Sequence, residues 1–161
     1  MKISDLQTFL QTFAPPALSE PWDNTGLLLG DPERELRRVM TCLTITPATV
    51  REAVAGRVEM IVSHHPMPFH ALKRITAETT VGRMLRELIR ADIAVYSPHT
   101  SYDSAAGGIN RQIAEGLGLT EIVPLVLWQP GTERQRSDRI EVETGSEVLS
   151  GHFTSLRSRL P

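Results

Sequence analysis

The sequence predicts an α/β fold, built on a largely parallel or mixed sheet with helices on its faces. Three segments rich in β-branched and apolar residues alternate with segments that place apolar residues at helical spacing. The strand-like segments are residues 39–46, 58–63 and 92–97, and the helical segments are residues 46–56, 79–90 and 105–117. Strands that alternate with helices of this length are typical of crossover connections, which make neighbouring strands parallel.

Two further elements precede this alternation. Residues 4–13 place four apolar side chains on one helical face, with Ser4 available as the N-cap, and a proline pair follows them. Residues 27–29 form a short apolar run between two turn-forming stretches, which predicts a short strand. The chain is therefore expected to begin with a helix and one short strand before the repeated pattern.

The regular pattern fades after residue 127. The segment that follows is polar and turn-prone, and only residues 140–143 resemble a strand. We therefore expect an α/β domain over residues 1–127 and a short C-terminal segment over residues 128–161.

Composition excludes several classes of protein. The 161 residues carry a formal net charge of −2 and no run of five like charges, so no nucleic-acid or anionic-membrane partner is expected. No apolar segment approaches the ~18 residues of a membrane span, and the N-terminus lacks the pattern of a secretory signal. The single cysteine, Cys42, lies in a predicted strand and is interpreted as a small buried apolar residue. These features predict a cytoplasmic protein.

Histidine placement is the strongest sign of chemistry. Four of the five histidines lie within residues 64–99, and His64 and His65 are adjacent where a predicted strand ends. Adjacent side chains of an extended chain point to opposite faces, so this pair suits two neighbouring metal ions, one imidazole to each. The competing interpretation is that they are surface or hydrogen-bonded structural histidines. For His70, five residues beyond the pair, a solvated loop position is favoured.

The next predicted strand also ends at candidate ligands. His99 follows it directly, and Asp103 lies four residues further on. Because the carboxyl ends of parallel strands meet at one edge of a sheet, both segments are expected to reach the same place. Imidazole and carboxylate suit Zn, Fe, Mn, Ni or Co, and the ligand types alone do not choose among them. Asp103 could instead cap the helix expected near Ala105, and turn chemistry explains Asp23 and Asn24 as well as a position beside the site does.

Four motifs carry a family resemblance. They are EPWDNTGLLLG (20–30), IVSHHP (61–66), SPHTSYD (97–103) and GGIN (107–110). Together, over about residues 1–125, they resemble the Nif-three-like dinuclear metal-centre proteins, also described as GTP cyclohydrolase I type 2 homologues.

The resemblance implies a centre with two divalent cations per chain. His64 and His65 would each bind a different ion, and Asp103 would supply the carboxylate ligand. His99 would lie beside the metals as a catalytic residue that orients groups or relays a proton, or it would serve as an occasional ligand. It also implies a homo-oligomer, in the form of a toroidal hexamer. The function implied is a metal-dependent hydrolase with an unknown small-molecule substrate.

The C-terminal segment departs from the family pattern. The family's second half, most of which is absent from these 161 residues, supplies a Gly-His-aromatic-x-x-Glu segment whose glutamate bridges both ions. Here Gly151, His152 and Phe153 match it, but Leu156 stands at the bridging position. His152 is therefore a candidate ligand, and we expect weaker and less complete metal loading than a full-length relative would show. This departure also favours an alternative function, a non-catalytic metal-binding or protein-interaction subunit, and a degenerate paralogue is a third interpretation.

Overall fold

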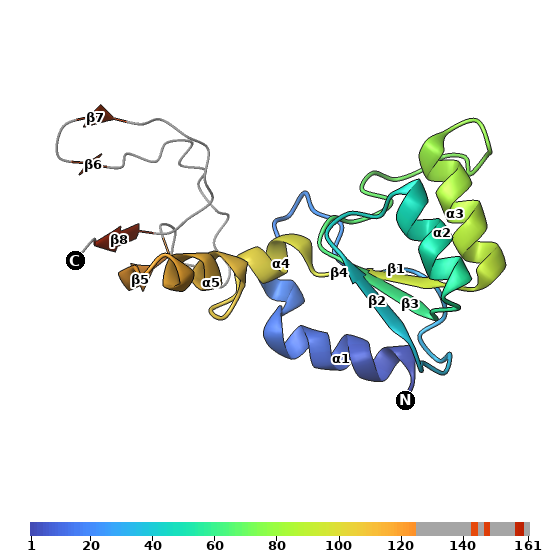
Figure 1. Ribbon diagram of the computed structural model, residues 1–161, viewed down its shortest axis with the longest axis horizontal. Coiled ribbons are helices and arrows are strands. Elements are labelled where there is room, and N and C mark those ends of the chain that lie inside the picture. Colours follow the sequence, from blue (N-terminus) through green and yellow to red (C-terminus); the bar gives the residue numbers. More distant parts are fainter. Residues whose placement is uncertain (125–142, 145–146, 149–156, 160–161) are drawn as a thin grey trace. The chain divides into compact units, whose positions relative to one another are not determined.

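The computed structural model describes residues 1–124 and three short strands at residues 143–144, 147–148 and 157–159. These residues divide into two units, Met1–Gly108 and Ile109–Pro161. A four-stranded sheet forms the centre of the first unit, in the spatial order β1-β4-β3-β2 (Figure 1). Its strands are β1 (Gly26–Leu29), β2 (Val39–Cys42), β3 (Met60–Ser63) and β4 (Ala94–Ser97).

The sheet is mixed, with three parallel strands and one antiparallel strand. β3 pairs in parallel with β2 on one side and with β4 on the other, and its residue Met60 faces Ala94 of β4. β1 adds to β4 in the antiparallel sense, with Gly26 opposite Ser97. The carboxyl ends of β2, β3 and β4 therefore lie along one edge of the sheet, and the start of β1 lies at that same edge.

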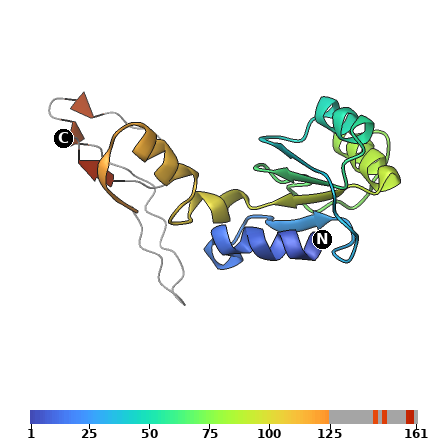
Figure 2. The ribbon, with the colours of Figure 1, turned by 60° about the horizontal axis from the view of Figure 1, so that its bottom comes forward.

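Helices cover both faces of this sheet. The helices of the first unit are α1 (Ile3–Phe13), the 3₁₀ turn η1 (Pro16–Leu18), α2 (Pro47–Ala55), α3 (Thr80–Ala91) and α4 (His99–Asp103). Figure 2 shows α1, in blue, on one side of the sheet and the pair α2 and α3, in cyan and green, on the other. The sequence prediction of an α/β fold with a mixed, helix-flanked sheet is confirmed.

Successive side chains along each strand point to opposite faces of the sheet, and an apolar core lies on each face. Tyr96 of β4 packs with Ile3 in the core beneath α1. Ile61 of β3 and Val95 of β4 point the other way and pack with Leu88 of α3. All five side chains are buried, and burial of each large apolar side chain contributes about 1.5–3 kcal/mol. The central strands are thus apolar on both faces, as parallel strands covered by helices must be.

The first helix begins earlier than expected. Ser4 is not its N-cap, because α1 starts at Ile3 and Lys2 is the capping residue. The backbone N–H of Lys2 donates to the carboxylate of Asp5 at 2.7 Å, so Asp5 satisfies the helix start from inside the first turn. The strands begin close to their expected positions, but β2 ends at Cys42, short of the expected residue 46.

The segment after β4 also differs from the expectation. The helix expected over 105–117 is α5, which spans only Ile109–Gly116, and the short helix α4 precedes it. Asp103 is therefore not the N-cap of the longer helix, since it is the last residue of α4. The sequence missed α4 because five residues are too short for a helical period to be recognised.

The second unit contains α5, β5 (Thr120–Val123) and three short strands: β6 (Glu143–Thr144), β7 (Glu147–Val148) and β8 (Arg157–Arg159). β5 pairs antiparallel with β8, and β6 with β7. The domain boundary expected near residue 128 falls outside the described residues, and so does most of the strand expected at 140–143. Over the part of the chain that the structure describes, none of the helices has the length and apolar character needed to cross a membrane.

Gly108 provides a test of the packing after α4. A Cβ at Gly108 would lie 1.8 Å from the carbonyl oxygen of Tyr102, whereas a Cβ at Gly107 would meet no atom within 4 Å. We expect Gly108→Ala to lower the free energy of unfolding by about 1–3 kcal/mol, because backbone must move to admit the methyl group. Gly107→Ala, the matched control, should change it by less than about 0.5 kcal/mol. Urea denaturation of both variants measures the difference, and equal effects would contradict the packing described.

Candidate metal centre

Three histidines meet at the carboxyl edge of the sheet. His64 and His65 directly follow β3, and His99 begins α4 one residue after β4 ends. One ring nitrogen from each lies within 4.8 Å of the other two. Nitrogens bound tetrahedrally to zinc at 2.0–2.1 Å are about 3.3 Å apart, so the cluster is somewhat wider than one occupied site. Small side-chain movements would bring the three nitrogens onto an ion.

The adjacent histidines do not alternate as they would in a strand. β3 ends at Ser63, and the chain then bends while the backbone N–H groups of His64 and His65 donate to the carbonyls of Cys42 and Leu43. Their ring centroids lie 5.0 Å apart. The expectation that the two side chains point to opposite faces is therefore wrong, because the extended conformation stops one residue before the pair. Whether each imidazole binds its own ion stays a prediction.

Two buried serines fix the backbone of this pair. The hydroxyl of Ser97, the last residue of β4, donates to the carbonyl of His64 at 2.6 Å. The hydroxyl of Ser63, the last residue of β3, donates to the carbonyl of His65 at 2.9 Å. Both serines are almost completely buried. Each histidine carbonyl thus has a buried partner, supplied for His64 by the end of the neighbouring strand β4 and for His65 by the end of β3 itself.

Asp103 lies at the rim of the histidine cluster. Its Oδ1 is 3.7 Å from Nε2 of His64. Burial lowers the pKa of His64 against the opposing attraction of Asp103, and burial likewise raises the pKa of Asp103. Burial therefore favours the neutral imidazole form of His64, which is the form that binds metal ions.

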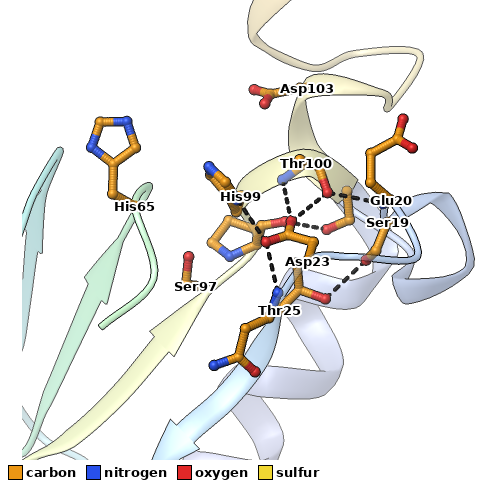
Figure 3. Close-up of polar contacts among 12 residues, drawn as sticks. Ser19, Glu20, Asp23, Thr25, His65, Ser97, His99, Thr100 and Asp103 are labelled. Carbon is orange, nitrogen blue, oxygen red and sulfur yellow. Dashed lines mark hydrogen bonds and ion pairs between the residues drawn. The ribbon is translucent and has the colours of Figure 1, made fainter. Parts of the chain in front are cut away.

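Asp23 is a member of the site that the sequence did not single out. Its Oδ1 accepts hydrogen bonds from Nδ1 of His99 at 2.8 Å and from the backbone N–H of Asn24 at 2.7 Å. Its Oδ2 accepts the backbone N–H of Thr100 at 3.1 Å and the hydroxyl of Thr100 (Figure 3). Burial raises the pKa of Asp23, but these hydrogen bonds outweigh it and lower the pKa overall. The only signal in the sequence was its place in the EPWDN motif, where turn chemistry was an equal explanation.

Thr44 is a second contact that the sequence did not reveal. Its hydroxyl lies 2.7 Å from Nδ1 of His65. The Nδ1 atoms of His65 and His99 are thus both engaged by protein side chains, and Nε2 is the nitrogen left to each for a ligand.

Other features of the sequence lie around the cluster or outside the described residues. His70 is exposed and is not part of the cluster, in agreement with a solvated loop position. Trp22 and Phe69 border His99, with ring centroids 6.4 and 6.2 Å from its ring. His152 lies outside the described residues, so its role as a ligand stays a prediction.

The model of one protein family matches most of the chain. That family is Duf34/NIF3 (NGG1p interacting factor 3), and the match covers residues 1–154. The chain belongs to the Duf34/NIF3 family. The resemblance inferred from the four sequence motifs is confirmed.

Individual relatives agree with the Duf34/NIF3 assignment. A GTP cyclohydrolase 1 type 2 homolog from Clostridium perfringens is 37% identical over 121 residues, which cover 75% of this chain and 46% of the relative. The NIF3-like protein 1 of Drosophila melanogaster is 36% identical over 154 residues, covering 92% of this chain and 52% of its own. A solved Bacillus cereus protein related to NIF3 superposes with a TM-score of 0.74 at 32% identity, over 78% of this chain and 35% of that one. The chain thus spans about half the length, or less, of these relatives.

The serine contacts behind the histidine pair can be tested by a substitution that removes one hydroxyl group. Ser97→Ala removes the hydroxyl that satisfies the buried carbonyl of His64, and we expect it to lower the free energy of unfolding by about 1–3 kcal/mol. The matched control is Ser104→Ala, because Ser104 is exposed and one turn beyond the cluster. It should change stability by less than about 0.5 kcal/mol in the same urea titration. A Ser97 variant as stable as the wild type would show that its hydrogen bond does not support the site.

Proposed function

We propose that this member of the Duf34/NIF3 family binds divalent cations through His64, His65, His99 and Asp103. With them it would act as a metal-dependent hydrolase on a small-molecule substrate. The observation that carries the proposal is the convergence of three imidazoles within 4.8 Å. The carboxylate of Asp103 beside them supplies an anionic ligand. The names of several relatives, such as the Clostridium perfringens homolog, are consistent with a hydrolytic activity.

The chemistry of the donor set fits transition metals. Imidazole nitrogen is the ligand that Zn, Fe, Mn, Ni and Co accept readily, whereas Mg²⁺ and Ca²⁺ prefer sites made of oxygen. The neutral state of His64 and the engaged Nδ1 atoms of His65 and His99 leave lone pairs for coordination. The described residues therefore form a ligand set for at least one ion, and the second ion implied by the motifs would need further ligands. His152 is our candidate among these.

The residues have separate roles in the proposed reaction. Divalent ions, when bound, lower the pKa of a water molecule toward neutrality and polarise the bond under attack. The three imidazoles bind the ions, and Asp103 offsets part of their positive charge. His99 keeps a fixed orientation because Asp23 holds its Nδ1 atom. The exposure of His65 leaves that side of the cluster open to a substrate.

Ring opening of GTP is not part of the proposal for this chain. Recognition of a triphosphate requires several cationic or backbone N–H donors directed at one point. Lys73 and Arg74 are the basic residues that most closely follow the histidine pair in sequence, and both are exposed on a loop. We therefore limit the substrate class to small molecules with a bond that hydrolysis can cleave.

A second function is favoured by one residue of the C-terminal segment. Leu156 stands where the motif resemblance expects a glutamate that bridges two ions, and a leucine side chain cannot bind a cation. Without that carboxylate, two dications repel each other more strongly, and occupancy falls. The alternative is therefore a metal-binding or protein-interaction subunit without turnover. A cytoplasmic location stays a prediction in either case.

Metal analysis of matched histidine variants tests the metal site. We expect the wild type, purified without chelator or a nickel column, to carry about one or two equivalents of transition metal per chain. His65→Ala should lose at least half of that metal because a ligand is removed. His70→Ala should retain it, since His70 lies outside the cluster.

Activity assays of the wild type, His65→Ala and His70→Ala distinguish the hydrolase from the subunit without turnover. Hydrolysis of a panel of phosphoesters, amides and nucleotides that depends on His65 would support the hydrolase, and metal binding without turnover would support the subunit. A folded wild type that contains no metal and takes up none would overturn the hydrolase and the metal-binding role, and it would leave only a protein-interaction role.

The partner that we propose is a further copy of the same chain. The motif resemblance implies a homo-oligomer, and β2 leaves one edge of the sheet without a further strand among the described residues. Light scattering coupled to size-exclusion chromatography should give a mass of several chains, with six as the number implied by the resemblance. A monomer at micromolar concentration would contradict this proposal without affecting the metal site.

A further inference from the structure

The buried carboxylate of Asp23 controls the protonation pattern of the neighbouring histidine ring. We infer that Asp23 is a positioning residue that holds His99 in the Nδ1–H tautomer and so directs the lone pair of Nε2 at the candidate metal centre. The side chain of Asp23 has no exposed surface, and its Oδ1 lies 2.8 Å from Nδ1 of His99.

Apart from His99, the hydrogen-bond partners of this carboxylate are all donors. The backbone N–H groups of Asn24 and Thr100 can only donate hydrogen bonds. The hydroxyl oxygen of Thr100 accepts the backbone N–H of Glu20 at 3.0 Å, which leaves its hydrogen for Oδ2 of Asp23. A carboxylate surrounded in this way is ionised and can only accept. The hydrogen between Asp23 and His99 must therefore belong to the ring.

The second ring nitrogen follows from the first. A neutral imidazole carries one N–H, so a hydrogen on Nδ1 leaves Nε2 as a lone pair. His65 lacks this constraint, because the hydroxyl of Thr44 can either donate to Nδ1 or accept from it. The tautomer is thus determined by the protein at His99 and left open at His65.

The fold brings the carboxylate to the ring from a distant part of the sequence. Asp23 and His99 are 76 residues apart. The antiparallel pairing of Gly26 with Ser97 places the loop before β1 against the residues that follow β4. His99 has a φ of 32°, a left-handed conformation that costs a residue with a Cβ on the order of 1–3 kcal/mol. The contacts of Asp23 with His99 and with the next residue, Thr100, hold the chain in that conformation.

The consequence concerns metal affinity and rests on the proposed function. A ring already in the correct tautomer and orientation needs no rearrangement before it binds an ion. Loss of such a hydrogen-bond partner behind a metal-binding histidine costs about 10–100-fold in affinity. Asp23 therefore raises affinity without touching the metal.

The tautomer can be measured directly on the whole 161-residue chain. Long-range ¹H–¹⁵N spectra of zinc-free protein distinguish protonated from unprotonated ring nitrogens, and the His99 signals are assigned by their loss in His99→Gln. We expect Nδ1 of His99 to be protonated and Nε2 unprotonated in the wild type. In Asp23→Asn the ring should lose this preference, and zinc affinity from competition with a chelating dye should fall about 10–100-fold.

Two controls separate positioning from stability. Thr100→Val removes one donor to the same carboxylate, so it should destabilise the fold while His99 keeps its tautomer. Thr44→Val should leave the His99 signals unchanged. Protonation of Nε2 in wild-type His99 would overturn the inference even if Asp23→Asn fails to fold, and so would an Asp23→Asn protein with unchanged tautomer and zinc affinity. A wild type that binds no zinc would overturn the proposed function, and the spectra would still decide the tautomer.

Discussion

The parallel pairing of β3 with β4 is the constraint on which the candidate site depends. Its register places Met60 opposite Ala94 and Val62 opposite Tyr96, so both strands end at the same level of the sheet. The residues that follow them, His64 and His99, therefore leave the sheet together, with ring centroids 5.3 Å apart. A slip of one residue would exchange the side chains of one strand between the two cores. Core packing beneath α1 and beneath α2 and α3 thus also positions the histidines.

The antiparallel strand β1 adds a different kind of contribution. β1 takes no part in the parallel pairing of β2, β3 and β4. Its antiparallel pairing with β4 places Asp23, in the loop before β1, at the edge where β4 ends. The side chain of Asn24 donates to the carbonyl of Pro68 at 2.7 Å, which ties the same loop to the segment after the histidine pair. The loop before β1 is thus bonded both to the chain after β3 and to the chain after β4. This loop therefore supplies hydrogen-bond partners to both segments that carry the histidines.

Sequence patterns predicted the features that are local or periodic. The three parallel strands are rich in β-branched residues, and their alternation with amphipathic helices was sufficient to place His64 and His99 at one edge. The contacts of Asp23 could not be predicted, because a pair separated by 76 residues leaves no periodic trace and an aspartate before an asparagine is also a common turn. The direction of His65 was also beyond prediction, since it depends on the hydrogen bond from its backbone to Leu43.

Two carboxylates at this edge show how environment separates their roles. Asp23 and Asp103 both lie near histidines, but the side chain of Asp23 is fully buried whereas that of Asp103 is 26% exposed. At Asp23 hydrogen bonds outweigh burial and the pKa is lowered, whereas at Asp103 burial dominates and the pKa is raised. The contact of Asp103 with His64, at 3.7 Å, is consequently not a strong ion pair, because burial lowers the pKa of His64 and so favours its uncharged form. Asp23 accepts hydrogen bonds from the protein itself and orients a histidine ring, while Asp103 lies beside the histidine cluster, where a bound cation would favour its ionised form.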